Sequence, residues 1–233
     1  RLVSVARHSF ERYIDVAATV GAWYVGSNPG AVYRDRMDTK NAGIDCYMGH
    51  MRELMHYARD KGLKGLTFEP MSSLAEPPST PDEVLHMTRT FAAYHRERPD
   101  TTVPVHVCGD ISHGVADVNR RVVHGNVELF ELEIPMMAEF HFKNTDAVFN
   151  STFGFSKTER SNGIVDLNDM ASLLHRTADQ WPVEDVVGYL EIGGPKTGRD
   201  YTDPHLRDML CDSIRALQEA MAGVVAENAV ACG

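Results

Sequence analysis

The sequence predicts an α/β fold of the (β/α) TIM-barrel class, with the N-terminal strands of the barrel missing from this chain. Three observations lead to this prediction. Short apolar segments alternate along the chain with longer segments whose apolar residues recur at helical spacing. No glycine-rich turn dominates, although an open nucleotide-binding sheet would be expected to carry one. The strand-like segments number five and a complete barrel has eight, so the chain corresponds to the latter part of a barrel.

The predicted elements begin with a helix over residues 2–20, and a single barrel domain is expected over residues 1–233. The clearest helix start lies at Thr80, a favourable N-cap that is followed by Pro81 at the first helical position. Strands are predicted over residues 22–25, 63–70, 102–110, 138–146 and 186–194. Further helices are predicted over residues 46–62, 80–97, 114–133 with a break at Gly125-Asn126, 166–180 with Asp166 as its cap, and 203–225.

Composition and charge exclude several classes of protein. Acidic residues outnumber basic residues by 33 to 23, giving a net charge of −10, whereas proteins that grip nucleic acid through its phosphates need a basic face. No apolar run reaches the ~18 residues that a membrane span needs. The four cysteines form no Cys-x-x-Cys pair, which fits a reduced cytoplasmic setting better than a disulfide framework. Because the chain begins at Arg1 inside a predicted helix, we expect that residues ahead of it are missing.

Polar residues stand where the predicted strands end. Glu69 follows the second strand and Asp110 the third, while His141 and Glu191 lie near the ends of the fourth and fifth. The carboxyl ends of barrel strands converge on one face, which carries the active site in this class of fold. Three carboxylates and an imidazole form a mostly oxygen-ligand set that suits one divalent ion such as Mn²⁺, Mg²⁺ or Co²⁺. The ion would also offset the mutual repulsion of the carboxylates.

Each of these residues has a simpler explanation when it is taken alone. A carboxylate after a strand is commonly a helix cap, and a single histidine is often a satisfied core residue. Four successive strands that each end in a metal ligand are difficult to attribute to chance, so the joint pattern favours a site.

Four short motifs resemble those of a known family. They are "LTFEPM" with Glu69, "CGDISHG" with Asp110, "AEFHFKNTD" with His141 and "GYLEI" with Glu191. In order and spacing they resemble the xylose-isomerase-like barrels, and within them the D-tagatose and D-psicose 3-epimerases, from about the third helix of the barrel to the C-terminus. The resemblance implies that the metal is bound by Glu69, Asp110, His141 and Glu191. It also implies that Glu69 and Glu191 are the paired catalytic acid and base, and that His113 hydrogen-bonds a substrate oxygen.

The chain departs from the free-sugar epimerases at Ala147, where those enzymes carry an arginine six residues beyond the ligand histidine. Basic residues follow the last two expected ligands instead, namely Lys143, Lys196 and Arg199. Loops after the seventh and eighth strands of barrels often hold a phosphate group. We therefore expect these three residues to contact the substrate, with a ketose phosphate as one candidate. The alternative is that they are ordinary solvated loop charges.

The predicted activity is the isomerisation or epimerisation of a ketose or ketose phosphate. A chelated carbonyl favours proton removal from the adjacent carbon, and the place of proton return decides between an epimer and an aldose–ketose isomer. A metal-dependent dehydratase of the keto-inositol type and a non-catalytic sugar-binding protein are alternatives on the same barrel. A DNA-repair endonuclease of this fold would need more histidine ligands and a basic face, against which the net charge of −10 argues. The expected partner is a small sugar or sugar phosphate, with no nucleic acid and no membrane, and self-assembly into a homo-oligomer stays open.

Overall fold

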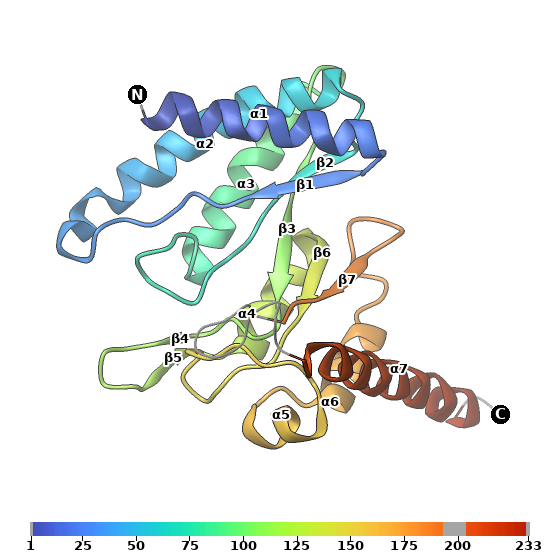
Figure 1. Cartoon of the computed structure of the whole chain (residues 1–233). Coiled ribbons are helices and arrows are strands. Elements are labelled where there is room, and N and C mark those ends of the chain that lie inside the picture. The colour runs from blue at the N-terminus through green and yellow to red at the C-terminus, as the bar shows by residue number, and fades with distance from the viewer. Residues whose placement is uncertain (1, 193–203, 232–233) are drawn as a thin grey trace. The chain divides into compact units, whose positions relative to one another are not determined.

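The computed structural model describes residues 2–192 and 204–231 and has a mixed α/β fold (Figure 1). Its main sheet has five strands in the order β1-β2-β3-β6-β7, which confirms the predicted count and leaves the barrel incomplete. The chain divides into two compact units, the first formed by Arg1–Gly109 with Met136–Ala138 and the second by Asp110–Pro135 with Glu139–Gly233. In the described part of the chain, no helix is both long and apolar enough to cross a membrane.

The strands of the main sheet place the predicted site residues at their carboxyl ends. They are β1 (Tyr24–Ser27), β2 (Gly65–Phe68), β3 (Val105–Asp110), β6 (Met137–Phe142) and β7 (Val187–Leu190). The pairs β1–β2, β2–β3 and β6–β7 are parallel, with Phe68 opposite Val107 and His141 opposite Tyr189. Parallel pairing brings the carboxyl ends of neighbouring strands to the same edge of a sheet.

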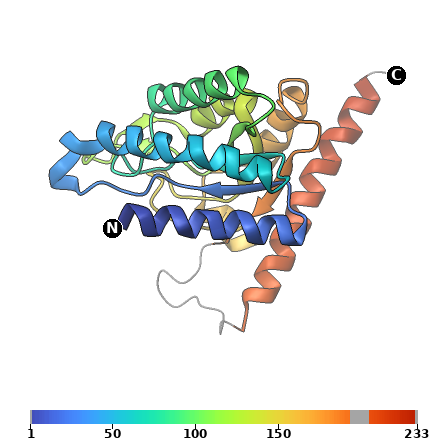
Figure 2. The same cartoon turned by 90° about the horizontal axis from the view of Figure 1, so that it is seen from above.

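The first unit has a core of methionine and phenylalanine side chains. Its helices are α1 (Leu2–Val20), the 3₁₀ helix η1 (Arg34–Thr39), α2 (Lys40–Asp60) and α3 (Pro81–Glu97). Helices α1 and α2 lie side by side (Figure 2). Met55, Phe68 and Phe91 are fully buried, and the two phenylalanine rings have centroids 6.0 Å apart. Thr80 caps α3 as predicted, because its hydroxyl oxygen accepts a hydrogen bond from the backbone N–H of Glu83.

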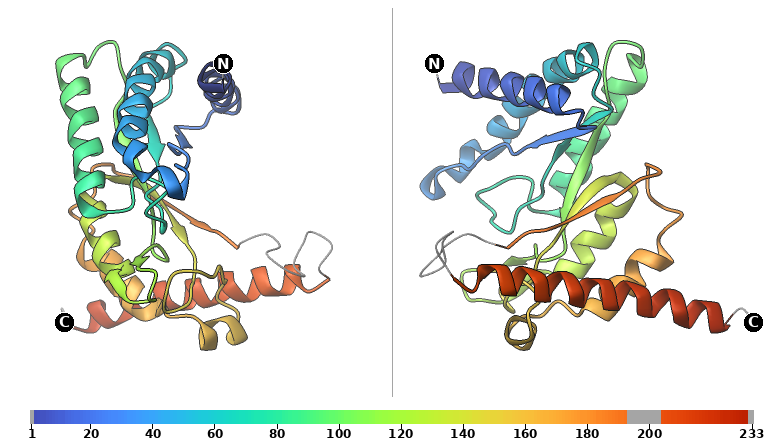
Figure 3. Two further views of the ribbon diagram at one scale, coloured as in Figure 1. Left: turned by 90° about the vertical axis from the view of Figure 1, so that its left-hand side faces the viewer. Right: turned by 45° about the vertical axis from the view of Figure 1, so that its right-hand side comes forward.

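The second unit has a core built around Phe130, Ile134 and Phe155, none of which is more than 1% exposed. Besides the ends of β3 and β6 and all of β7, its elements are β4 (Val115–Ala116), β5 (Val122–His124), α4 (Asn126–Glu133), η2 (Ile134–Met136), α5 (Lys157–Asn162), α6 (Leu167–Arg176) and α7 (Leu206–Ala231). Helices α6 and α7 pack against each other (Figure 3). Asp166 caps α6 as predicted.

The segment 114–123 was predicted to be helical, and this prediction is wrong, because β4 and β5 form an antiparallel hairpin there. Asp117 explains the difference. Its Oδ1 accepts hydrogen bonds from the backbone N–H groups of Asn119 and Arg121, at 2.8 and 2.9 Å, and so closes a turn that competes with a helix. Arg120 has a φ of 64° in this turn, outside the helical region. The helical part of the predicted segment is α4 alone.

Two helices differ from the prediction in extent or existence. Helix α2 begins at Lys40 rather than at Cys46. Lys40 is buried and its ammonium lies 2.5 Å from the carboxylate of Glu83 in α3, a contact that no local pattern reveals. Helix α5 lies in a segment that was expected to be a loop, and Ser156 and Glu159 form a capping box at its start.

Candidate metal site

Asp110 ends strand β3 and provides the most buried group of the site, with a side chain that is 0% exposed. Its Oδ1 accepts a hydrogen bond from the backbone N–H of Ser112 at 2.8 Å. Its backbone carbonyl accepts one from the N–H of His113 at 3.0 Å. These two bonds form the turn after the strand and fix the carboxylate, so that Oδ2 faces His141 and Lys143.

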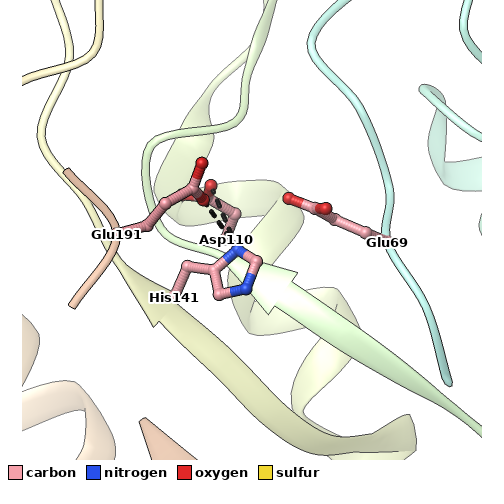
Figure 4. A group of neighbouring side chains, drawn as sticks. All are labelled: Glu69, Asp110, His141 and Glu191. Carbon is pink, nitrogen blue, oxygen red and sulfur yellow. Dashed lines mark ion pairs between the residues drawn. The ribbon is translucent and has the colours of Figure 1, made fainter. Parts of the chain in front are cut away.

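Strand β6 and the residue that follows it direct two side chains to the same carboxylates. Successive side chains of a strand point to opposite faces, so His141 shares a face with Lys143, two residues further on. His141 Nδ1 lies 3.7 Å from Asp110 Oδ2 and 2.9 Å from Glu191 Oε2 (Figure 4). The Lys143 ammonium lies 2.5 Å from Asp110 Oδ2 and 3.0 Å from Glu191 Oε2. The same two carboxylate oxygens therefore face both side chains.

Glu191 joins this group because of the pairing between β6 and β7. Phe142 lies opposite Leu190, and the backbone N–H of Glu191 donates to the carbonyl of Phe142 at 3.0 Å. This hydrogen bond extends the pairing of β6 with β7 by one residue beyond the end of β7. It directs Glu191 toward His141 and Lys143. The Glu191 side chain is 40% exposed, so this side of the group is open to small molecules.

Asp110, His141 and Glu191 fit a divalent metal ion. Each offers one ligand atom, and these three atoms lie within 4.8 Å of one another. Two carboxylate oxygens and one imidazole nitrogen are a ligand set that Mn²⁺, Mg²⁺ or Co²⁺ accepts. The Lys143 ammonium offsets the repulsion between these two carboxylates, and a bound cation would do the same.

The surroundings keep both carboxylates ionised. Burial on its own would raise the pKa of Asp110. The side chains of His113, His141 and Lys143 outweigh burial and hold that pKa well below its usual range. The hydrogen bond with His141 lowers the pKa of Glu191 against the effect of its burial, and Lys143 adds to the lowering. Burial would lower the pKa of Lys143, but the carboxylates of Asp110 and Glu191 raise it. The carboxylates are therefore in the deprotonated form that metal binding requires.

His113 lies at the edge of the same group. Its Nε2 is 3.3 Å from Asp110 Oδ2 and 3.3 Å from the Lys143 ammonium. The next residue, Gly114, lies against the ring of Phe149, and a Cβ at Gly114 would overlap that ring. Phe149 itself has a φ of 60°, which is uncommon for a residue with a bulky side chain. A side chain at position 114 would therefore require the ring of Phe149 to shift.

The second unit brings together most of the residues that the sequence singled out, namely Asp110, His113, His141, Lys143 and Glu191. Glu69 belongs to the first unit, where it follows β2 and its backbone N–H donates to the Asn28 side-chain oxygen at 3.1 Å. Lys196 and Arg199 lie outside the described residues. The pairing of Lys143 with both carboxylates was not predicted, although the His-x-Lys spacing near a strand end indicates that the two side chains share a face.

Comparison with known proteins identifies the fold. No protein-family model and no curated protein sequence matches the chain. A xylose-isomerase-like protein from Rhodospirillum rubrum is 21% identical, with a TM-score of 0.70 over 93% of this chain and 68% of its own. A D-tagatose 3-epimerase-like protein is 14% identical, with a TM-score of 0.68 over 96% and 71%. A D-psicose 3-epimerase solved in the presence of D-fructose is 14% identical, with a TM-score of 0.60 over 93% and 70%. The structural neighbours are thus those that the sequence motifs implied, and at these identities the likeness establishes the fold.

Proposed function

We propose that the chain belongs to a divalent-metal-dependent isomerase or epimerase that acts on a ketose or ketose phosphate. The observation that carries this proposal is the convergence of Asp110, His141 and Glu191 near the carboxyl ends of three strands. Active sites of (β/α) barrels lie at this end of the strands. The similar structures support a sugar as the substrate, because their names refer to xylose, D-tagatose and D-psicose.

We propose Glu69 as the fourth ligand and as the second catalytic carboxylate. Strand β2 pairs in parallel with β3, and Phe68 lies opposite Val107. Glu69 therefore leaves β2 at the edge of the sheet at which Asp110 ends β3. This parallel pairing supports the assignment of Glu69 as a metal ligand, which the motif "LTFEPM" suggested.

In the proposed reaction a bound metal would stabilise the negative charge that develops on the carbonyl oxygen of the substrate. One carboxylate, Glu191 or Glu69, accepts the proton from the carbon beside the carbonyl, and the electrons of the broken C–H bond form the enediolate. The opposite carboxyl group then donates a proton to the other face of the same carbon, which gives an epimer. If the proton is instead removed from C1 and returned to C2, the former carbonyl carbon, while the proton of the C1 hydroxyl passes to the C2 oxygen, the product is an aldose. His113 donates a hydrogen bond to a substrate oxygen, and no redox partner is needed.

Exchange of solvent deuterium into the substrate tests this function. The chain is incubated in D₂O with Mn²⁺ and a panel of ketoses and ketose phosphates, and the products are analysed by NMR and mass spectrometry. We expect deuterium at the carbon next to the carbonyl, without loss of water. Loss of water with formation of a dione would assign the protein to the keto-inositol dehydratases instead. Absence of exchange with every compound in the presence of Mn²⁺, Mg²⁺ and Co²⁺ would contradict the proposal.

For the finer choice of substrate, we propose a phosphorylated ketose whose phosphate is contacted by Lys196 and Arg199. These residues follow Glu191 in the sequence, after the last predicted strand, and position 147 carries alanine instead of the arginine of the free-sugar enzymes. A hydrogen bond from Lys or Arg to phosphate contributes about 1.5–3 kcal/mol, or roughly ten- to a hundredfold in affinity. Lys196→Ala and Arg199→Ala should therefore raise KM for the phosphorylated substrate and leave KM for the free sugar unchanged. Equal effects on both substrates, or a free sugar that is the better substrate, would rule the phosphate out.

A further inference from the structure

Lys143 is expected from the sequence to contact the substrate, and the proposed reaction gives it no step of its own. It is buried, with 8% of its side chain exposed. A buried ammonium is costly unless it is paired, and a lysine beside the ligands of a divalent cation brings a like charge toward that cation. Its position therefore calls for a physical explanation.

The contacts of Lys143 coincide with those of the candidate metal site. Its ammonium lies 2.5 Å from Asp110 Oδ2 and 3.0 Å from Glu191 Oε2. These are the oxygens that also face His141 Nδ1, at 3.7 and 2.9 Å. A cation that binds these oxygens thus shares them with the ammonium.

The neighbours of Lys143 fix the position of its backbone, and burial restricts its side chain. It comes directly after Phe142, whose carbonyl accepts the hydrogen bond from the Glu191 N–H at 3.0 Å. The next residue, Asn144, is fully buried and accepts hydrogen bonds from the N–H groups of Thr145 and Val165, both at 2.9 Å. The lysine is therefore held between two anchored residues with its ammonium on the carboxylates.

We propose that Lys143 is a built-in counter-ion of the metal site, which holds Asp110 and Glu191 together in the metal-free protein and lowers the affinity for the divalent ion by sharing their oxygens. This inference rests on the proposed metal-dependent function. The proposal predicts that removal of the Lys143 charge changes the stability of the metal-free protein and its affinity for the metal in opposite directions. Removal of the charge destabilises the metal-free protein, because two carboxylates are left close together, and it strengthens metal binding, because a repulsive charge is gone. A lysine that only fills space or only positions a ligand does not produce both effects.

The test measures Mn²⁺ affinity by calorimetry, and thermal unfolding with and without Mn²⁺, in the full chain after removal of metal. Lys143→Met keeps most of the length of the side chain and removes its charge. We expect this variant to bind Mn²⁺ at least about tenfold more tightly than the wild type. Without metal, the Tm of this variant should be lower than that of the wild type. Addition of Mn²⁺ should raise the Tm of the variant by more than it raises the Tm of the wild type.

Lys61→Met is the matched control. Lys61 also pairs with a carboxylate, that of Asp15 at 2.6 Å, but this pair lies on the surface with side chains 39% and 37% exposed. Loss of an exposed pair changes stability little, and we expect unchanged Mn²⁺ affinity. Lys143→Gln repeats the neutralisation if the methionine variant fails to fold.

The outcomes separate this inference from the proposed function. A wild type that binds Mn²⁺ together with neutral variants that bind it equally or more weakly would overturn the counter-ion role alone. A wild type that does not bind Mn²⁺ while Lys143→Met does would support the counter-ion role and overturn the metal-dependent function. If neither protein binds, both proposals fail. Normal Mn²⁺ binding with no deuterium exchange would overturn only the proposed reaction.

Discussion

Among the single residues, Asp110 and Glu191 are two carboxylates of the candidate metal site, and their environments differ. Asp110 is fully buried and has one oxygen committed to the backbone of Ser112, so it is suited to holding a ligand rather than to transferring protons. Glu191 is 40% exposed, and His141 and Lys143 hold its pKa below the usual range. Because a lowered pKa makes a carboxylate a weaker base, the proposed role of Glu191 as the base rests on its exposure, which Asp110 lacks.

Glu191→Gln keeps the shape of the side chain and removes the base. We expect it to lower kcat by about 10² or more, the usual scale for an acid–base group, and Glu69→Gln should do the same. The turnover of the substrate identified by deuterium exchange is the measurement, and Glu184→Gln, at an exposed position, is the control. Near-normal turnover in either site variant would reject a mechanism with two carboxylates.

At the level of elements, the alternation of side chains along a strand and the caps of helices do most of the positioning. His141 in β6 lies against the carboxylates of Asp110 and Glu191. Because side chains alternate between the two faces of an extended chain, Lys143, two residues further on, lies on the same side as His141. Helix α6, which packs against α7, begins at Asp166, whose Oδ1 accepts hydrogen bonds from the backbone N–H groups of Asn168 and Asp169 at 2.8 and 3.0 Å. These bonds satisfy two donors that the first turn of a helix otherwise leaves unpaired.

Asp166→Ala should therefore lower the free energy of unfolding by about 1 kcal/mol, within a range of roughly 0.5–2 kcal/mol. Urea denaturation followed by circular dichroism measures this change. Asp179→Ala, at an exposed position after the end of α6, should change stability much less. An equal loss in the two variants would show that the cap contributes nothing specific.

At the level of the whole molecule, a half-buried histidine links stability to pH. His106 lies in β3, and its ring meets that of Tyr24 edge-on, with centroids 5.9 Å apart. Burial lowers the pKa of His106 to about 4, and the nearby His95 adds to the lowering. The unfolded chain binds a proton at His106 near pH 6.5, whereas the folded chain does so only near pH 4. The free energy of unfolding therefore falls as the pH decreases through this window.

His106→Gln removes this proton-linked loss. Between about pH 6.5 and 4, the wild type should lose up to about 1.4 kcal/mol per pH unit more than the variant. Denaturation curves recorded across this range give the two slopes, and their difference cancels the contribution of the other titrating groups. His86→Gln, at an exposed position of the first unit, should follow the slope of the wild type. Identical slopes for wild type and His106→Gln would disprove the linkage.

Much of this architecture could be predicted from local patterns. The five strands, the leading helix, the cap at Thr80 and the cap at Asp166 were all visible in the sequence. Periodicity and capping depend on residues a few positions apart, so both can be recognised in the sequence alone. The presence of Asp110, His141 and Glu191 near strand ends was likewise a local observation, which parallel pairing turned into a prediction of proximity.

The sequence by itself thus determined the order of strands and helices and the types of ligand at the strand ends. Only the tertiary structure decided which charges meet. Lys143 pairs with Glu191, 48 residues away, and Lys40 at the start of α2 pairs with Glu83 in α3. The hairpin over β4 and β5 also escaped prediction, because the side chain of Asp117 competes with the helix that the apolar spacing favours. The physical reason is that ion pairs and turn-closing hydrogen bonds form wherever the fold brings their atoms within about 3 Å. The separation of two residues along the sequence does not predict that distance.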